Sequence, residues 1–159
     1  MNKVERYNLP EELIHEEIKK LEKERVVERI QQHDHTLWKD DPEEIGNRLG
    51  WLNSHEKMIG ALGEIHDLTK EIRQAGYTDA LLLGMGGSSM APEVYRKIFG
   101  VKPGYLELNI LDSTDPGAIL GKEKKLDFSK TLFIVSTKSG GTVETFSLMK
   151  YFYTRSIEI

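Results

Sequence analysis

Residues 80–89 read Ala-Leu-Leu-Leu-Gly-Met-Gly-Gly-Ser-Ser, a short apolar run followed by a turn with three glycines and two serines. A short apolar run that stops at a turn signal is a candidate buried β-strand. The residues after the turn have a helical pattern, so the stretch predicts a strand–turn–helix unit. Such units build parallel sheets.

Two more units of this kind follow along the chain. Their apolar runs cover residues 106–111 and 131–135, and each is followed by a turn rich in Gly, Ser, Thr or Asp. The intervening segments, residues 84–104 and 112–130, are long enough for the crossover helices that parallel strands require. We therefore predict an α/β fold with a parallel sheet whose sites lie at the carboxyl ends of the strands.

Two of these turns have the composition of an oxyanion site. Phosphate groups are held by hydroxyls, by a cation and by backbone N–H groups that glycine allows to approach closely. The turn over residues 84–89 opens a helix with glycines and serines, and the predicted helix over residues 142–153 points its positive end at the second turn. That second turn consists of Ser136, Thr137, Lys138, Ser139, Gly140, Gly141 and Thr142. We therefore predict an anion site at this edge of the sheet.

The chain before residue 77 has a different character. Residues 1–76 hold 12 Lys and Arg against 17 Asp and Glu, whereas residues 77–159 hold 10 against 9 and contain nine of the 14 glycines. We therefore predict two parts, a helical N-terminal segment over residues 1–76 and a sheet domain over residues 77–159.

Apolar stripes and capping residues predict three helices in the first part. One covers residues 8–34 and is capped by Asn8, because its apolar positions trace one face. A second begins at Asp41-Pro42-Glu43-Glu44, which has the spacing of a capping box. A third covers residues 54–75 and ends at Gly76.

Composition excludes several classes of protein. The chain has no cysteine, which rules out disulfide scaffolds, thiolate nucleophiles and iron–sulfur clusters. Its net charge of −4 predicts no general affinity for nucleic acid or an anionic membrane. No apolar run approaches the roughly 18 residues of a membrane span, so we expect a cytoplasmic protein. The His33-x-His35 pair has no carboxylate at ligand spacing, and we expect no metal.

Competing phosphate-binding motifs fit less well. The G-x-x-x-x-G-K-[ST] loop of nucleoside triphosphatases is absent. Gly84-x-Gly86-x-x-Ser89 is close to the dinucleotide fingerprint, and Asp112 follows the second strand as a ribose-binding acid would. However, Ser89 stands where the fingerprint has its third glycine. The fingerprint also does not explain the turn over residues 136–142. Dinucleotide binding stays the lesser alternative, and we predict no cofactor. Asp115-Pro116 is interpreted as a helix start.

Both glycine-rich turns resemble segments of the phosphoglucose isomerase family. Residues 84–92, Gly-Met-Gly-Gly-Ser-Ser-Met-Ala-Pro, resemble its G-I-G-G-S-x-x-x-P segment. Residues 136–145, Ser-Thr-Lys-Ser-Gly-Gly-Thr-Val-Glu-Thr, resemble its S-K-T-x-x-T-x-E-T signature, the phosphate loop of the sugar-isomerase (SIS) fold. Residues 35–52 are similar to the region before the isomerase in bacterial transaldolase/glucose-6-phosphate isomerase fusions. Thr137 stands where many members of the family have serine, and Gly140-Gly141 stands where they have bulkier residues.

This resemblance implies roles for named residues. Thr137, Lys138, Ser139 and Thr142 would hold the 6-phosphate, and Gly87 and Ser88 would line the sugar site. The implied ligands are glucose 6-phosphate and fructose 6-phosphate, interconverted through an enediol without a cofactor. The full-length family member is expected to be a homodimer.

The family's catalytic segments have no counterpart in the chain. Its G-G-R loop and its E-S-N-G-K-like loop, which carries the glutamate base, are absent, and no histidine follows residue 76. Glu144 is expected to be a structural partner of the phosphate turn. The resemblance implies a three-layer parallel sheet of the SIS, flavodoxin-like type. We therefore expect an N-terminal fragment with an incomplete SIS sheet and no isomerase activity of its own. The alternative is a non-catalytic, regulatory phosphosugar-binding module, and the two hypotheses differ in the sequence that the parent gene encodes after Ile159.

Overall fold

The computed structural model of the chain describes residues 10–158. The chain divides into two compact units whose boundary lies between Leu62 and Gly63. This boundary falls within helix α3 (Ser54–Gln74). The division predicted from composition, at residues 76 and 77, stays a prediction. None of the helices in the described range is long and apolar enough to cross a membrane.

The first unit contains two helices where the sequence predicts one. The prediction of a single helix over residues 8–34 is wrong, because α1 (Glu11–Lys23) and α2 (Val26–Gln31) are separate. The break occurs at Arg25, whose φ of 53° is left-handed and cannot continue a right-handed helix. The predicted cap Asn8 lies outside the described residues, and Pro10 occupies the cap position of α1.

The helix predicted to begin at Asp41 is also absent. The Asp41 carboxylate accepts a hydrogen bond from the Glu43 backbone N–H at 2.9 Å, which forms a local turn in place of a helix start. Glu44 has a φ of 62°, and its carboxylate accepts a hydrogen bond from Arg48 at 2.6 Å. The rest of this region forms three 3₁₀ helices, η1 (His35–Leu37), η2 (Gly46–Arg48) and η3 (Gly50–Asn53).

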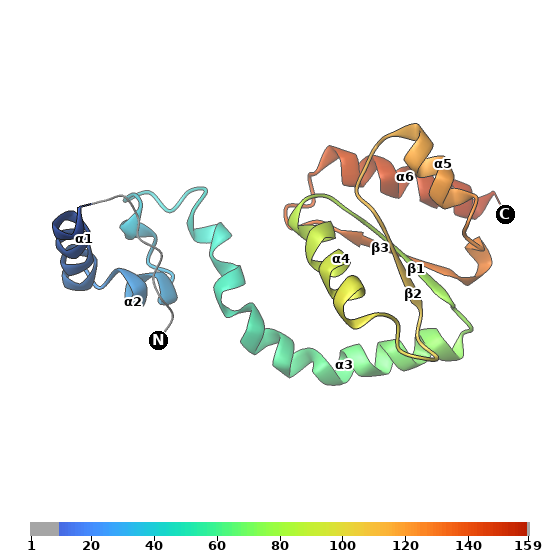
Figure 1. The fold of residues 1–159 in the computed structure, drawn as a ribbon, viewed down its shortest axis with the longest axis horizontal. Helices are drawn as coiled ribbons and strands as arrows, with labels where there is room; N and C mark the ends of the chain where they lie inside the picture. Colours follow the sequence, from blue (N-terminus) through green and yellow to red (C-terminus); the bar gives the residue numbers. More distant parts are fainter. Residues whose placement is uncertain (1–9, 159) are drawn as a thin grey trace. The chain divides into compact units, whose positions relative to one another are not determined.

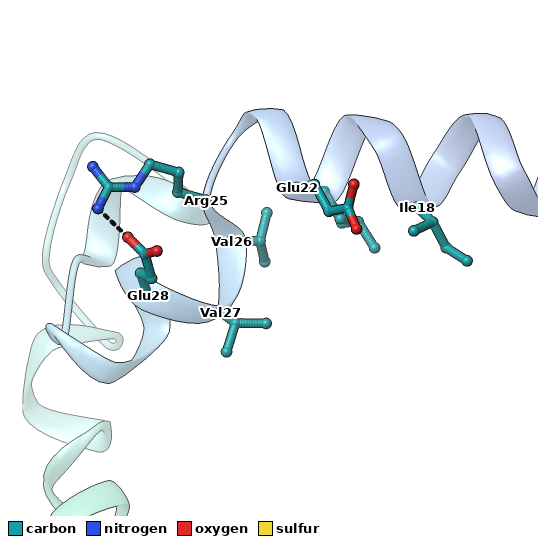
Figure 2. A pocket seen from close by; sticks show the side chains of 7 residues that line it. Ile18, Glu22, Arg25, Val26, Val27 and Glu28 are labelled. Atoms are coloured by element: carbon teal, nitrogen blue, oxygen red, sulfur yellow. Dashed lines mark ion pairs between the residues drawn. The ribbon is translucent and has the colours of Figure 1, made fainter. Parts of the chain in front are cut away.

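An apolar hollow of about 390 Å³ lies between α1 and α2 (Figure 2). Ile18, Val26 and Val27 line it, and the ion pair between Arg25 and Glu28 lies beside them. Leu21 and Glu22 complete the lining. The lining is therefore mixed: four of its residues are aliphatic and three, Glu22, Arg25 and Glu28, are charged.

Helix α3 and its end agree with the sequence prediction. The helix covers Ser54–Gln74, and Gly76 follows with a φ of 86°, a conformation that costs glycine little. Its last turn is tied to a later loop of the second unit, because the Arg73 guanidinium donates to the Gly104 carbonyl at 2.6 Å and lies over the Tyr105 ring.

The second unit is a three-stranded parallel sheet between helices (Figure 1). Its strands are β1 (Asp79–Gly84), β2 (Glu107–Leu111) and β3 (Thr131–Ser136), in the order β2-β1-β3. Helix α4 (Gly87–Phe99) covers one face, and α5 (Pro116–Glu123) and α6 (Val143–Ile157) cover the other. The predicted α/β fold, with a parallel sheet after a helical segment, is confirmed.

The core lies between the sheet and the α5/α6 layer. Leu81 and Leu83 of β1 point into it because alternate residues of a strand share a face. They meet Leu148 and Phe152 of α6, each 1% exposed, and Leu111 of β2. Phe152 also stacks on Phe133 at 5.3 Å between ring centroids. This packing fixes α6, and with it the turn that precedes α6, on the sheet.

A polar cluster joins α5 to α6 at the side of this core. Glu123, 14% exposed, accepts a hydrogen bond from the Tyr151 hydroxyl at 2.5 Å and from the Arg155 Nε at 2.7 Å. These two bonds hold the pKa of the Glu123 carboxyl below its ordinary value of 4.5, with the tyrosine contributing most. The cluster therefore stabilises the fold only while Glu123 is ionised.

We predict a pH-dependent stability loss that is specific to Glu123. Because its pKa is lowered on folding, the cluster's contribution is complete above the unfolded value of about 4.5 and disappears as pH falls through the folded value. The Glu123→Gln variant should therefore melt at a lower temperature than the wild-type chain at pH 7. This difference in melting temperature should become smaller below about pH 4.5. The measurement is thermal unfolding followed by circular dichroism between pH 7 and pH 3.

The matched control is Glu158→Gln. Glu158 also pairs with Arg155, at 2.5 Å, but its side chain is 52% exposed. Its substitution should change the melting temperature less than Glu123→Gln does at pH 7. The proposed contribution of Glu123 would be contradicted if both substitutions lowered the melting temperature equally at pH 7. It would also be contradicted if the loss for Glu123→Gln were the same at every pH.

Candidate functional site

The strand register brings the predicted site turns to one edge of the sheet. Leu83 of β1 is paired with Leu111 of β2 and with Val135 of β3, and Gly84 is paired with Ser136. Because the three parallel strands end at the same level, the turns that follow them all begin there. The central position of β1 makes its glycine-rich turn a neighbour of both other turns.

The turn over residues 136–142 brings its predicted phosphate ligands together. The Thr137 and Thr142 hydroxyls lie 3.3 Å apart and are partly buried. Lys138 and Ser139 are exposed, and the Ser139 hydroxyl accepts a hydrogen bond from the Gly141 N–H at 3.2 Å. The structure therefore places all four predicted residues on one short turn, with two hydroxyls in mutual contact and a cation beside them.

Helix α6 begins directly after this turn. Thr142 occupies its N-cap position, but its hydroxyl makes no capping hydrogen bond and lies against Thr137 instead. The first N–H groups of a helix have no partner within it, and they carry about half a positive charge at this end. The turn therefore lies where backbone donors and the helix dipole both favour an anion.

Glu144 has a different place from the one expected. It is exposed in the first turn of α6, where its charge complements the helix dipole. In the described part of the chain, no hydrogen bond or ion pair joins Glu144 to the phosphate turn. The expectation that Glu144 is a structural partner of that turn is therefore not supported, because its carboxylate faces solvent.

The turn after β1 has a conformation that requires glycine. Gly86 precedes α4 with φ 58° and ψ −127°, a combination that side chains disfavour. The buried Ser89 hydroxyl donates to the Gly86 carbonyl at 2.8 Å. Gly87 is exposed and Ser88 is half-buried at the first positions of α4. The two predicted sugar-site residues are therefore accessible at a helix N-terminus.

The two turns are in close contact at Gly84. A Cβ atom on Gly84 would lie 3.1 Å from the Ser136 carbonyl oxygen and 3.2 Å from the Ser88 Cβ. Both distances are shorter than ordinary van der Waals contact. The absence of a side chain at Gly84 therefore allows the start of α4 to lie beside the start of the phosphate turn.

We expect Gly84→Ala to destabilise the chain by about 1–3 kcal/mol, because the added methyl group overpacks this contact. The control is Gly87→Ala, since a Cβ there would meet nothing within 4 Å. Both variants add one methyl group to the same segment. Urea unfolding should therefore show a lower midpoint for the first variant and a midpoint close to wild type for the second. Equal midpoints would mean that the turns are not closely packed.

The third turn, after β2, begins a helix as predicted. Asp115 caps α5 by accepting a hydrogen bond from the Ala118 N–H at 2.8 Å. Asp112 is exposed at the end of β2, at the level where a ribose-binding acid would lie. Among residues 10–158, no group of three or more His, Asp or Glu side chains is placed to hold a metal ion.

One buried polar residue beside the turn has no role predicted from the sequence. Thr145, in the first turn of α6, is 1% exposed, and its hydroxyl has no hydrogen-bond partner within the described residues. In the sequence, Thr145 is the last residue of the stretch 136–145 that resembles the S-K-T-x-x-T-x-E-T signature. It also follows Thr142 by three residues, which places both residues on one side of the helix.

Comparisons with known proteins identify similar sequences. No protein-family model matches. The glucose-6-phosphate isomerase of Acaryochloris marina is 40% identical over 99 residues, which are 59% of this chain and 18% of that protein. The glucose-6-phosphate isomerase of Campylobacter jejuni is 37% identical over 105 residues, which are 65% of this chain and 26% of that protein. The glucose-6-phosphate isomerase of Thermus thermophilus is 32% identical over 111 residues, which are 69% of this chain and 25% of that protein.

A solved structure shares the fold. The crystal structure of a hypothetical protein from Thermus thermophilus superposes with a TM-score of 0.52 and 27% identity, over 87% of this chain and 31% of that one. The chain spans between 13% and 26% of the length of the curated relatives it matches. Together, these similarities support a relationship to the glucose-6-phosphate isomerases over a limited part of their length.

Proposed function

We propose that the chain binds the phosphate group of a hexose 6-phosphate, as one part of a glucose-6-phosphate/fructose-6-phosphate isomerase. The observation that carries this proposal is the close contact, at Gly84, between two glycine- and hydroxyl-rich turns at one sheet edge. One of these turns includes Lys138 and precedes α6. The similarity to proteins named glucose-6-phosphate isomerase supports the identity of the ligand.

The phosphate turn can balance the charge of its proposed ligand. A phosphate ester carries about −1.5 to −2 charges near pH 7. Lys138 supplies one positive charge, and the N-terminus of α6 supplies about half of another. The Thr137 and Thr142 hydroxyls, which contact each other at 3.3 Å, can turn to donate to phosphate oxygens. Ser139 supplies a third hydroxyl from the exposed side of the turn.

The sugar carbons are proposed to extend from the phosphate toward the start of α4. The phosphate turn and the start of α4 meet at Gly84, so a ligand held by Lys138 can reach Gly87 and Ser88 next to it. Gly87 allows close approach of its N–H, and the Ser88 hydroxyl can donate or accept. These groups can orient a hydroxyl or carbonyl oxygen of the sugar.

The isomerisation itself needs groups beyond this half-site. Aldose–ketose conversion opens the sugar ring and then moves a proton between C1 and C2 through an enediol, which requires a base and groups that polarise both oxygens. The turns described here contain neither a histidine nor an arginine. We therefore propose that the chain contributes binding and orientation, and that these residues alone catalyse no turnover. The homodimer remains a prediction from the resemblance, and the cytoplasmic location remains a prediction from the pattern of apolar residues.

Calorimetric titration of the purified chain with glucose 6-phosphate tests this proposal. Saturable binding is expected, with weaker binding of inorganic phosphate and none of glucose, because the phosphate supplies the charge and the sugar adds contacts at α4. A coupled assay for fructose 6-phosphate should show no turnover. Equal affinity for glucose and glucose 6-phosphate would contradict the phosphate site, and measurable turnover would contradict the proposed division of roles.

A further inference from the structure

The Thr145 hydroxyl is the most unusual polar group near the phosphate turn. It is buried, with the residue 1% exposed, and it has no hydrogen-bond partner within residues 10–158. Buried polar groups in native proteins are nearly always paired, since leaving one unpaired loses its bonds to water without replacement. An unpaired hydroxyl beside a binding turn therefore suggests a partner that arrives in another state of the turn.

The position of Thr145 points its side chain toward that turn. It follows Thr142 by three residues, so the two residues lie one above the other on α6. Helical side chains lean toward the N-terminus of their helix, which here is the end that carries the turn. On the other side, Leu148 and Phe152 continue the same buried face into the core.

The turn itself is held by weak contacts and can rearrange. The bond between the Thr137 and Thr142 hydroxyls is long, at 3.3 Å, and the bond from the Gly141 N–H to the Ser139 hydroxyl is 3.2 Å. Gly140 has a φ of 72°. A Cβ atom on Gly140 or on Gly141 would meet nothing within 4 Å. The Gly140–Gly141 segment therefore has both conformational freedom and space.

We propose that Thr145 is a positioning residue that holds the turn in its anion-bound arrangement, an inference that rests on the proposed phosphate site. A helical threonine hydroxyl commonly donates to the carbonyl three or four residues earlier. The carbonyl of Thr142 already accepts from the Phe146 N–H at 3.0 Å. The Gly141 carbonyl accepts no backbone hydrogen bond among the described residues, so it is the open acceptor that the Thr145 hydroxyl gains when the turn closes.

This hydrogen bond would aim a backbone donor at the phosphate. The C=O and N–H groups of one trans peptide point in opposite directions. When the Gly141 carbonyl turns toward Thr145, the N–H of Thr142 in the same peptide turns outward, to the side of the bound anion. The Thr142 hydroxyl leaves Thr137 in the same movement, so that both hydroxyls can donate to phosphate oxygens. Thr145 thus acts on the ligand through the Gly141–Thr142 peptide.

Thr145→Val and Thr145→Ser separate this role from a structural one. Valine keeps the shape but removes the hydroxyl, so the unliganded Thr145→Val chain should melt at a higher temperature, because a buried unpaired group is gone. Its affinity for glucose 6-phosphate should nevertheless fall about three- to tenfold, the value of one neutral hydrogen bond. Thr145→Ser should restore most of the affinity. A merely structural threonine would not move stability and affinity in opposite directions.

A second measurement uses the unaltered chain and is independent of how the valine variant folds. In ¹⁵N-labelled protein, saturation with glucose 6-phosphate should move the Thr142 amide resonance and slow its hydrogen exchange. Wild-type affinity in Thr145→Val, or an unchanged Thr142 amide in the saturated wild-type chain, overturns the role of Thr145 alone. If the wild-type chain does not bind glucose 6-phosphate, the proposed function and this inference fail together.

Discussion

Phe152→Ala should lower the free energy of unfolding by about 3–5 kcal/mol, the usual cost of removing a buried phenylalanine side chain. Phe152 is 1% exposed at the centre of the core and contacts Phe133 and Tyr151 at 5.3 and 5.2 Å between ring centroids. Alanine would leave a cavity that the surrounding strands cannot fill by small shifts. A loss of this size is a large part of the stability of an ordinary domain.

The next residue along the chain provides the matched control. Tyr153 is also aromatic and lies on the same helix, but it is 67% exposed. Tyr153→Ala should therefore change the unfolding free energy by less than about 1 kcal/mol. Urea unfolding of the full chain, followed by circular dichroism, measures both variants. If both variants lose the same stability, α6 is not packed on the sheet by the face assigned to it.

Lys138→Ala should weaken the binding of glucose 6-phosphate about 10- to 150-fold, because a charge-assisted contact to phosphate contributes roughly 1.5–3 kcal/mol. Lys138 is exposed on the turn, so its loss leaves no buried group without a partner. The melting temperature of the unliganded chain should stay close to wild type. Isothermal titration calorimetry at low and moderate salt measures the effect, and the wild-type affinity should fall with added salt.

Lys130→Ala is the control for net charge. Lys130 is exposed and directly precedes β3, at the opposite end of that strand from the phosphate turn. This variant removes the same charge from the segment before β3, so its affinity should stay within about twofold of wild type once salt screens the difference. Equal weakening by both substitutions would mean that overall charge, and not the turn, attracts the ligand.

The sheet could be predicted from sequence because each of its elements has a strong local signal. The three apolar runs match β1, β2 and β3 within one residue at each end. Glycine at residue 76 and aspartate at residue 115 mark helix ends, and both have the predicted roles. The common level of the three strand ends then follows from parallel pairing. The position of all three turns at one edge of the sheet can therefore be predicted from the sequence alone.

The first unit could not be predicted in the same way, because its residues allow more than one local structure. Asp41-Pro42 and Asp115-Pro116 are the same dipeptide, yet the carboxylate of Asp41 accepts from the N–H two residues on and that of Asp115 from three residues on. Of the two dipeptides, only the second begins an α-helix. Similarly, the left-handed Arg25 interrupts a helical pattern without a glycine or proline to announce the break.

The candidate site was predicted in part. Residue types and spacing indicate a phosphate turn over residues 136–142, but not that the Thr137 and Thr142 hydroxyls face each other. Nor do they indicate that the Thr145 hydroxyl lacks a partner among the described residues, because that depends on how α6 packs against the sheet. These details arise from tertiary packing.

Amide chemical shifts of the ¹⁵N-labelled chain, recorded during a titration with glucose 6-phosphate, test most directly whether phosphate binds at this sheet edge. Saturable shifts are expected for residues 137–143 and 86–88, because the phosphate and the sugar are proposed to contact these two turns. Residues of α1 and α2 should not respond. A titration in which the largest shifts lie outside both turns, or in which no resonance moves at millimolar ligand, would contradict the proposed site.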